Sequence, residues 1–217
     1  MRTERWTGIA GVVLLTSVIA GIVFETMGPN LSMTPDQMSA SFKNGQVTVG
    51  LATTFLLIQK VVLVGFAVGL ATLAARGEKD HTISRLILVS GTLQVAITMV
   101  YVATFQALVS VAGQLAVPVL FGLATVGENM DLAGMPFLGL MIAAGANGLA
   151  RARLLPRWVG RFGLVAGVLL VLGSLSLLSP QSFFFMLPLL LGVLLTVIWL
   201  GIASVALIRA RDLVPAA

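Results

Sequence analysis

Long runs of apolar residues, separated by short polar stretches, make up most of the chain. A helix of about 20 predominantly apolar residues is long enough to cross the hydrocarbon core of a bilayer. The pattern therefore predicts an all-α fold, a polytopic helical membrane bundle in a single domain over residues 1–217. The six expected transmembrane helices cover residues 6–27, 47–75, 83–111, 132–150, 158–178 and 183–208.

One apolar stretch does not fit a simple succession of spans. No charged residue occurs between Arg85 and Glu128, and this interval is too long for one helix across the membrane. Gly113 and Pro118 are expected to interrupt it. The piece that remains is too short to cross, so we expect a re-entrant or interfacial helix on the outer side over about 116–131.

The composition supports a lipid environment. Hydrophobic residues make up 58% of the chain and charged residues 10%, whereas soluble domains carry about 25% charged residues. The absence of cysteine excludes disulfides and iron–sulfur clusters. The single histidine, His81, lies in a charged loop. We therefore expect no metal site and no cofactor.

The basic residues predict how the chain is oriented. Of the 13 lysines and arginines, all except Lys43 and Lys60 flank the expected spans on one side. Cytoplasmic loops carry such an excess of basic residues, so both termini are expected in the cytoplasm of a bacterial cell, with the chain in the inner membrane. This distribution explains the net charge of +5 without a nucleic-acid partner. The expected partner is the lipid bilayer.

Lys60 and the adjacent Gln59 lie near the middle of the expected span over residues 47–75. A lysine at this depth costs about 2.5–3.5 kcal/mol and is a functional-site hypothesis by default. One interpretation makes Lys60 the polar anchor of an intramembrane pocket. The other makes it a structural residue, paired with an acid or capped by polar side chains to fix the packing.

The next span carries a polar stripe that matches Lys60 in depth. Ser90, Gln94, Thr98 and Tyr101 fall on one face of the helix. Polar side chains that face lipid would lack hydrogen-bonding partners, so this face is expected to turn toward Lys60. Gln94, Thr98 and Tyr101 are therefore candidate ligand-binding residues together with Lys60 and Gln59.

Three acidic residues are candidate partners for Lys60. Glu25, near the end of the first span, is preferred because short loops favour the packing of consecutive helices. Glu128 and Asp131 are alternatives if segment 116–131 dips into the membrane. With Asn129, these two carboxylates also form a weak candidate for cation binding. A solvated outer loop is the favoured interpretation of that cluster.

The stretch Leu155–Gly167, LPRWVGRFGLVAG, enters an apolar span directly after a basic loop. This stretch and the overall layout resemble a bacterial family of small six-span membrane proteins of unknown function. The resemblance implies a six-helix membrane fold and supplies no catalytic residues.

Three functions are consistent with the sequence. The first is binding, or helping to move, an amphiphilic small molecule near Lys60. The second is an intramembrane enzyme acting on a lipid or isoprenoid, with Lys60 and either Glu25 or Glu128 as acid–base groups. The third is a structural or accessory membrane subunit. We favour the first, because the stripe is rich in amides and hydroxyls but poor in titratable pairs. Transport by only six spans would require a homodimer.

Overall fold

The computed structural model describes residues 3–26, 33–178 and 183–209. Six of the helices in this part of the chain are long and apolar enough to cross a membrane, which confirms the expected all-α membrane fold. The helices are α1 (Thr3–Thr26), α2 (Pro35–Asn44), α3 (Gln46–Ala74), α4 (Thr82–Val111), α5 (Val117–Arg151), α6 (Arg157–Gly173) and α7 (Phe183–Arg209). Two short 3₁₀ turns, η1 (Ala75–Gly77) and η2 (Ser174–Leu178), follow α3 and α6.

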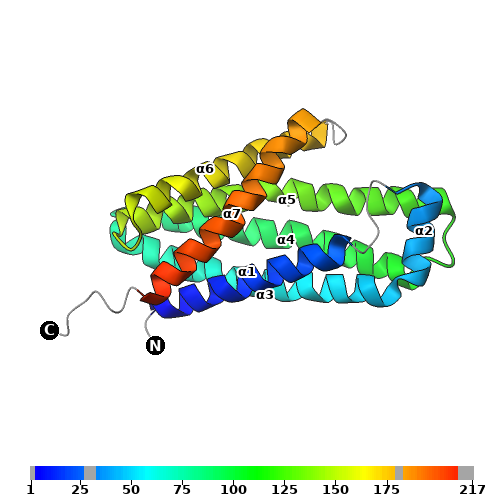
Figure 1. Ribbon diagram of the computed structural model, residues 1–217, viewed down its shortest axis with the longest axis horizontal. Coiled ribbons are helices and arrows are strands. Elements are labelled where there is room, and N and C mark those ends of the chain that lie inside the picture. The colour runs from blue at the N-terminus through cyan, green and yellow to red at the C-terminus, as the bar shows by residue number, and fades with distance from the viewer. Residues whose placement is uncertain (1–2, 27–32, 179–182, 210–217) are drawn as a thin grey trace.

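The six long helices form a closed ring. Each packs on the next in the order α1, α3, α4, α5, α6 and α7, and α7 returns to pack on α1. Helix α3 also contacts α5. Figure 1 shows α7 crossing the bundle obliquely, so that it meets α1 near one end only. This crossing leaves space within the ring toward the other end.

Small residues allow these helices to approach closely. A Cβ atom on Gly139 of α5 would lie 2.5 Å from the carbonyl oxygen of Gly167 on α6. On α1, a Cβ atom on Gly8 would lie 2.8 Å from the carbonyl oxygen of Ser204 on α7, and a Cβ atom on Gly11 would collide with the Ser204 side chain. Close backbone contact of this kind drives helix association in lipid, where burial of apolar side chains from water contributes little. The glycines therefore set both the α5–α6 contact and the closure of the ring.

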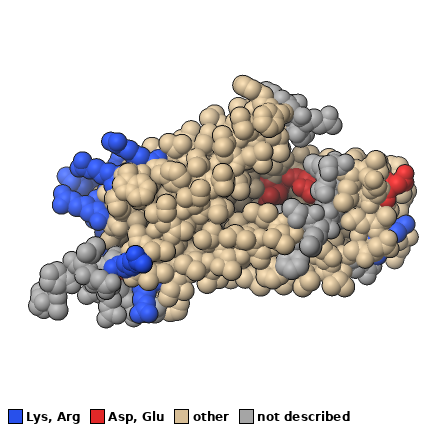
Figure 2. Space-filling view, viewed as in Figure 1, with Lys and Arg blue, Asp and Glu red and all other residues tan. Residues whose placement is uncertain are grey.

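The basic side chains gather at one end of the ring, hereafter the basic end (Figure 2). Helices α1, α4 and α6 begin there, and α3, α5 and α7 end there. An ion pair between Arg76 and Glu4 joins η1 to the start of α1. Arg2 and Arg211 lie outside the described residues. The described basic residues of this end are Arg5, Arg76, Lys79, Arg85, Arg151, Arg153, Arg157, Arg161 and Arg209.

Helix α2 covers part of the opposite end, hereafter the α2 end (Figure 1). Thr34 and Gln37 form a capping box at its start, with the Thr34 N–H donating to Gln37 Oε1 at 2.9 Å. Its buried side chains Met38 and Phe42 join a hydrophobic cluster with residues of α3, α4 and α5. Phe42 packs on Phe105, with ring centroids 5.5 Å apart. Helix α2 therefore covers this end of the ring over α3, α4 and α5.

The prediction of a separate outer segment over 116–131 was wrong. These residues form the first part of α5, which runs without a break from Val117 to Arg151. Pro118 lies in the first turn of the helix, where proline is well tolerated because the N–H it lacks would have no partner there. At about 1.5 Å per residue α5 is about 52 Å long, so it extends well beyond a hydrocarbon core of about 30 Å. The further helix outside the six spans is α2.

The α5–α6 contact gives a test of the packing. Gly139→Ala should destabilise the protein by about 1–3 kcal/mol, because the added methyl group would force two backbones apart. Gly65→Ala is the matched control, since a Cβ atom there meets nothing within 4 Å. Thermal unfolding in detergent, followed by circular dichroism, would compare the two variants with the wild type. Equal melting temperatures for both variants would contradict the close packing of α5 on α6.

Candidate intramembrane pocket

A pocket of about 230 Å³ lies inside the ring. Residues from all six long helices line it, and most of them are aliphatic. Pockets for small ligands usually combine an apolar wall with a few convergent polar groups. The polar side chains in the wall are Gln59, Lys60, Gln94, Asp131 and Thr196.

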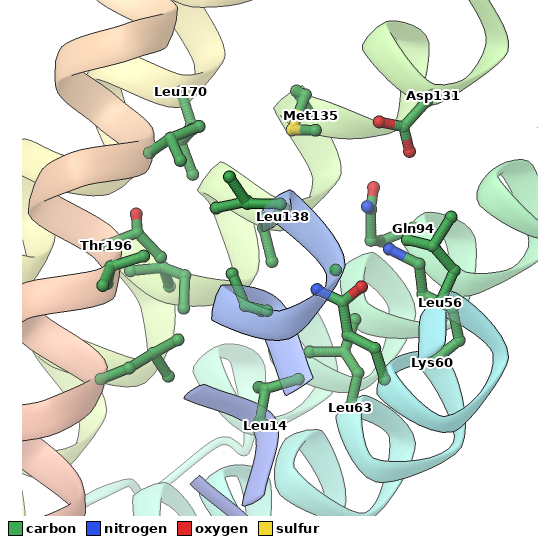
Figure 3. Close-up of a pocket in the computed structure, with 18 residues that line it drawn as sticks. Leu14, Leu56, Lys60, Leu63, Gln94, Asp131, Met135, Leu138, Leu170 and Thr196 are labelled. Atoms are coloured by element: carbon green, nitrogen blue, oxygen red, sulfur yellow. The ribbon is translucent and has the colours of Figure 1, made fainter. Parts of the chain in front are cut away.

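Lys60 and Asp131 are the charged side chains of the pocket wall among the described residues. Lys60 is the central residue of α3 and is only 5% exposed. Asp131 comes from α5, and its carboxyl group lies within the electrostatic influence of Lys60. Figure 3 shows the two side chains at the same side of the pocket, with Gln94 between them. Asp131 therefore places an opposite charge on the same side of the pocket as Lys60 (Figure 3).

Two side chains of α4 extend this polar group. The Thr98 hydroxyl donates a hydrogen bond to the Asp131 carboxylate. Gln94 Nε2 in turn donates to Thr98 Oγ1 at 3.2 Å. Gly134 of α5 makes room for this arrangement, because a Cβ atom there would lie 2.5 Å from Gln94 Oε1. Lys60, Asp131, Thr98 and Gln94 thus form one connected network across α3, α4 and α5.

Two buried polar atoms of the wall have no hydrogen-bonding partner among the described residues. They are Gln94 Oε1 on α4 and Thr196 Oγ1 on α7. Gln94 is fully buried and Thr196 is 5% exposed. An unsatisfied buried polar group costs about 1–3 kcal/mol. A molecule in the pocket that bonds to these atoms would remove this penalty.

The structure brings some of the sequence candidates together and separates others. Gln59, Lys60 and Gln94 line the pocket, and Thr98 is buried behind Gln94. Tyr101 is not part of the wall. It lies in the hydrophobic cluster below α2, where its ring packs on Phe105 with centroids 4.5 Å apart.

The acidic candidates also differ in position. Asp131 faces Lys60, whereas Glu128 and Asn129 are partly buried on α5 outside the pocket wall. In the described part of the chain, no three His, Cys, Asp or Glu side chains are grouped as metal ligands. Glu25 belongs to the last turn of α1, but its side chain lies outside the described part of the structure. The preferred pairing of Lys60 with Glu25 stays a prediction.

Sequence reasoning did not identify Thr196 as a site residue. A sequence signal for Thr196 was present, because Thr196 and Ser204 are the hydroxyl residues in a helix, α7, that is otherwise mostly apolar. The sequence pattern does not give the rotation of α7 about its axis. In the structure this rotation turns Thr196 toward Gln94 and Lys60 rather than toward lipid. The contribution of α1 and α7 to the apolar wall depends on the same packing.

The fold and the pocket define a multi-pass helical membrane protein with a charged pair inside the bundle. The chain belongs to the family described as Domain of unknown function (DUF4386), which matches residues 9–203. This match contains the stretch Leu155–Gly167 and agrees with the expected membership of an uncharacterised family. Neither the curated proteins nor the solved structures contain a significant match to the chain.

The charge pair can be tested by a double-mutant cycle. Lys60→Met and Asp131→Asn should each destabilise the protein by up to about 3–5 kcal/mol, because each removes one side of the electrostatic attraction between the two groups. The double variant should recover a large part of the loss, since neither charge remains. Thermal unfolding in lipid nanodiscs measures all four proteins. Additive losses in the double variant would contradict a direct interaction between the two side chains.

Proposed function

We propose that this protein binds, or helps to move, an amphiphilic small molecule in the pocket between Lys60 and Thr196. The strongest support is the pair of buried atoms, Gln94 Oε1 and Thr196 Oγ1, that have no partner among the described residues and lie on opposite walls of a largely aliphatic cavity (Figure 3). An amphiphile suits this site, because its polar group can bond to these atoms while its apolar part contacts the aliphatic wall.

We further propose that the protein resides in a bacterial inner membrane with its basic end in the cytoplasm. The clustering of nine described basic residues at one end, with Lys43 on α2 at the other, supports this orientation. The α2 end then lies toward the outer face.

An intramembrane enzyme acting on a lipid or isoprenoid is the second candidate. It is favoured by the position of Lys60 and Asp131, two titratable groups in one cavity wall. The hydrogen bond from Thr98 and the attraction to Lys60 hold Asp131 in place, an arrangement that suits binding better than proton transfer. A structural or accessory subunit is the third candidate. Such a subunit would not require a molecule bound in the cavity.

Filling the pocket tests the proposal directly. Gly21 of α1 lines the cavity, and a Cβ atom there meets nothing within 4 Å. Gly21→Leu should therefore fold and occupy the space that a bound molecule needs. Native mass spectrometry of protein released from lipid nanodiscs should show a bound small molecule on the wild type and its loss, by about tenfold or more, in the variant.

Gly65→Leu is the matched control. It also places leucine at an open helical glycine, but on the exposed face of α3 outside the pocket. This variant should retain the bound molecule. The same occupancy in both variants, or a wild type that carries no molecule, would contradict the proposed binding function.

A further inference from the structure

We propose that the molecule held in this pocket is an uncharged single-chain amphiphile that enters sideways from the lipid, between α1 and α7. This inference rests on the proposed binding function and adds the chemical class of the ligand and its route. It combines three observations, which are the paired charges of the wall, the small volume of the cavity and the divergence of two helices.

The charges of the wall favour an uncharged head group. Lys60 and Asp131 lie in one wall and attract each other, so this wall carries both signs of charge. A charged head group would have to compete with one member of the pair and would enter a largely aliphatic cavity without a counter-ion of its own. A hydroxyl or amide can instead bond to Gln94 Oε1 or Thr196 Oγ1, which lack partners among the described residues. The site is therefore suited to hydrogen bonding without a net charge.

The cavity volume favours a single chain. The pocket of about 230 Å³ is smaller than most small-molecule sites, whose volumes are about 300–1,000 Å³. This space suffices for a small polar group and the first part of one hydrocarbon chain. A second chain or a large head group would have to remain outside this space, in the lipid.

The route follows from the way α1 and α7 separate. Near the basic end, a Cβ atom on Gly11 would collide with Ser204. Further along, a Cβ atom on Gly201 of α7 would lie 3.6 Å from Leu15. At Gly21, about 15 Å beyond Gly11 by helical rise, a Cβ atom would meet no atom of the described residues within 4 Å. The two helices thus touch at the basic end and diverge toward the α2 end.

The pocket is positioned along this divergence. Gly21 and Ile22 of α1 and Val193 of α7 belong to its wall, and Ile22 is 43% exposed. Figure 2 shows a hollow on this face with acidic side chains visible inside it. Helix α2 covers the ends of α3, α4 and α5, because Met38 and Phe42 are buried there. The opening between α1 and α7 therefore leads to the lipid-facing side of the ring.

Three probes with the same saturated chain test the charge preference. Dodecanol is uncharged, dodecanesulfonate is a permanent anion and dodecyltrimethylammonium is a permanent cation. Equilibrium binding of each radiolabelled probe would be measured on protein in phosphatidylcholine nanodiscs, with empty nanodiscs subtracted. The wild type should bind dodecanol at least about tenfold more tightly than either charged probe. Gly21→Leu should lose this binding, and Gly65→Leu should keep it.

Single charge variants should change the preference in opposite directions. Asp131→Asn removes the negative charge from this wall and should favour dodecanesulfonate, whereas Lys60→Met removes the positive charge and should favour dodecyltrimethylammonium. If these variants do not fold, the wild-type comparison still decides. A wild type that binds a charged probe as tightly as dodecanol, or folded single variants that retain the wild-type preference, would overturn the inference alone. No saturable binding of any probe to the wild type would overturn the proposed binding function as well.

Discussion

A charge in the interior of a membrane bundle has to be met by other parts of the same protein, because lipid offers neither hydrogen bonds nor counter-ions. In this structure that constraint falls on Lys60, the central residue of α3. The opposing charge of Asp131 brings α5 toward α3, and Thr98 of α4 holds the carboxylate from the side. Three consecutive long helices are thereby placed by one polar network, and their remaining surfaces pack through apolar and small residues.

The other half of the ring depends on backbone contact rather than charge. Helix α6 packs on α5 where Gly139 and Gly167 meet, and α7 packs on α1 at Gly8 and Gly11. Because the α1–α7 contact is confined to the basic end, the ring is tight there and open further along. The pocket is a consequence of this asymmetry. Its polar atoms come from the charge-organised half and from Thr196, while α1 and α7 supply much of its apolar wall.

The continuity of α5 illustrates how polar residues are misread in an apolar sequence. Glu128, Asn129 and Asp131 have the composition of a solvated loop, and the spacing of the other spans left too few residues for a further crossing. Within the bundle, however, Asp131 has a hydrogen bond from Thr98 and an opposite charge nearby. A helix can therefore run through this stretch without an unpaired charge. The continuous helix also places Arg151 at the basic end with the other arginines, as the charge pattern requires.

The sequence alone determined the number of long apolar helices. The hydrocarbon thickness sets the length of each helix, and the free energy of placing a helix in lipid depends on its own residues. It also determined the gathering of basic residues at one end, since consecutive helices alternate in direction. The depths of Lys60, Gln94 and Thr98 followed from the constant rise of an α-helix.

Only the tertiary structure decided that Asp131 lines the pocket with Lys60, that Tyr101 lies outside it and that Thr196 belongs to its wall. These features depend on how each helix is rotated and where it crosses its neighbours. Tyr101 lies about 10 Å beyond Gln94 along α4, which places its ring beneath α2 rather than in the pocket. Rotation and crossing are set by side chains from several helices at once, so no single stretch of the sequence carries that information.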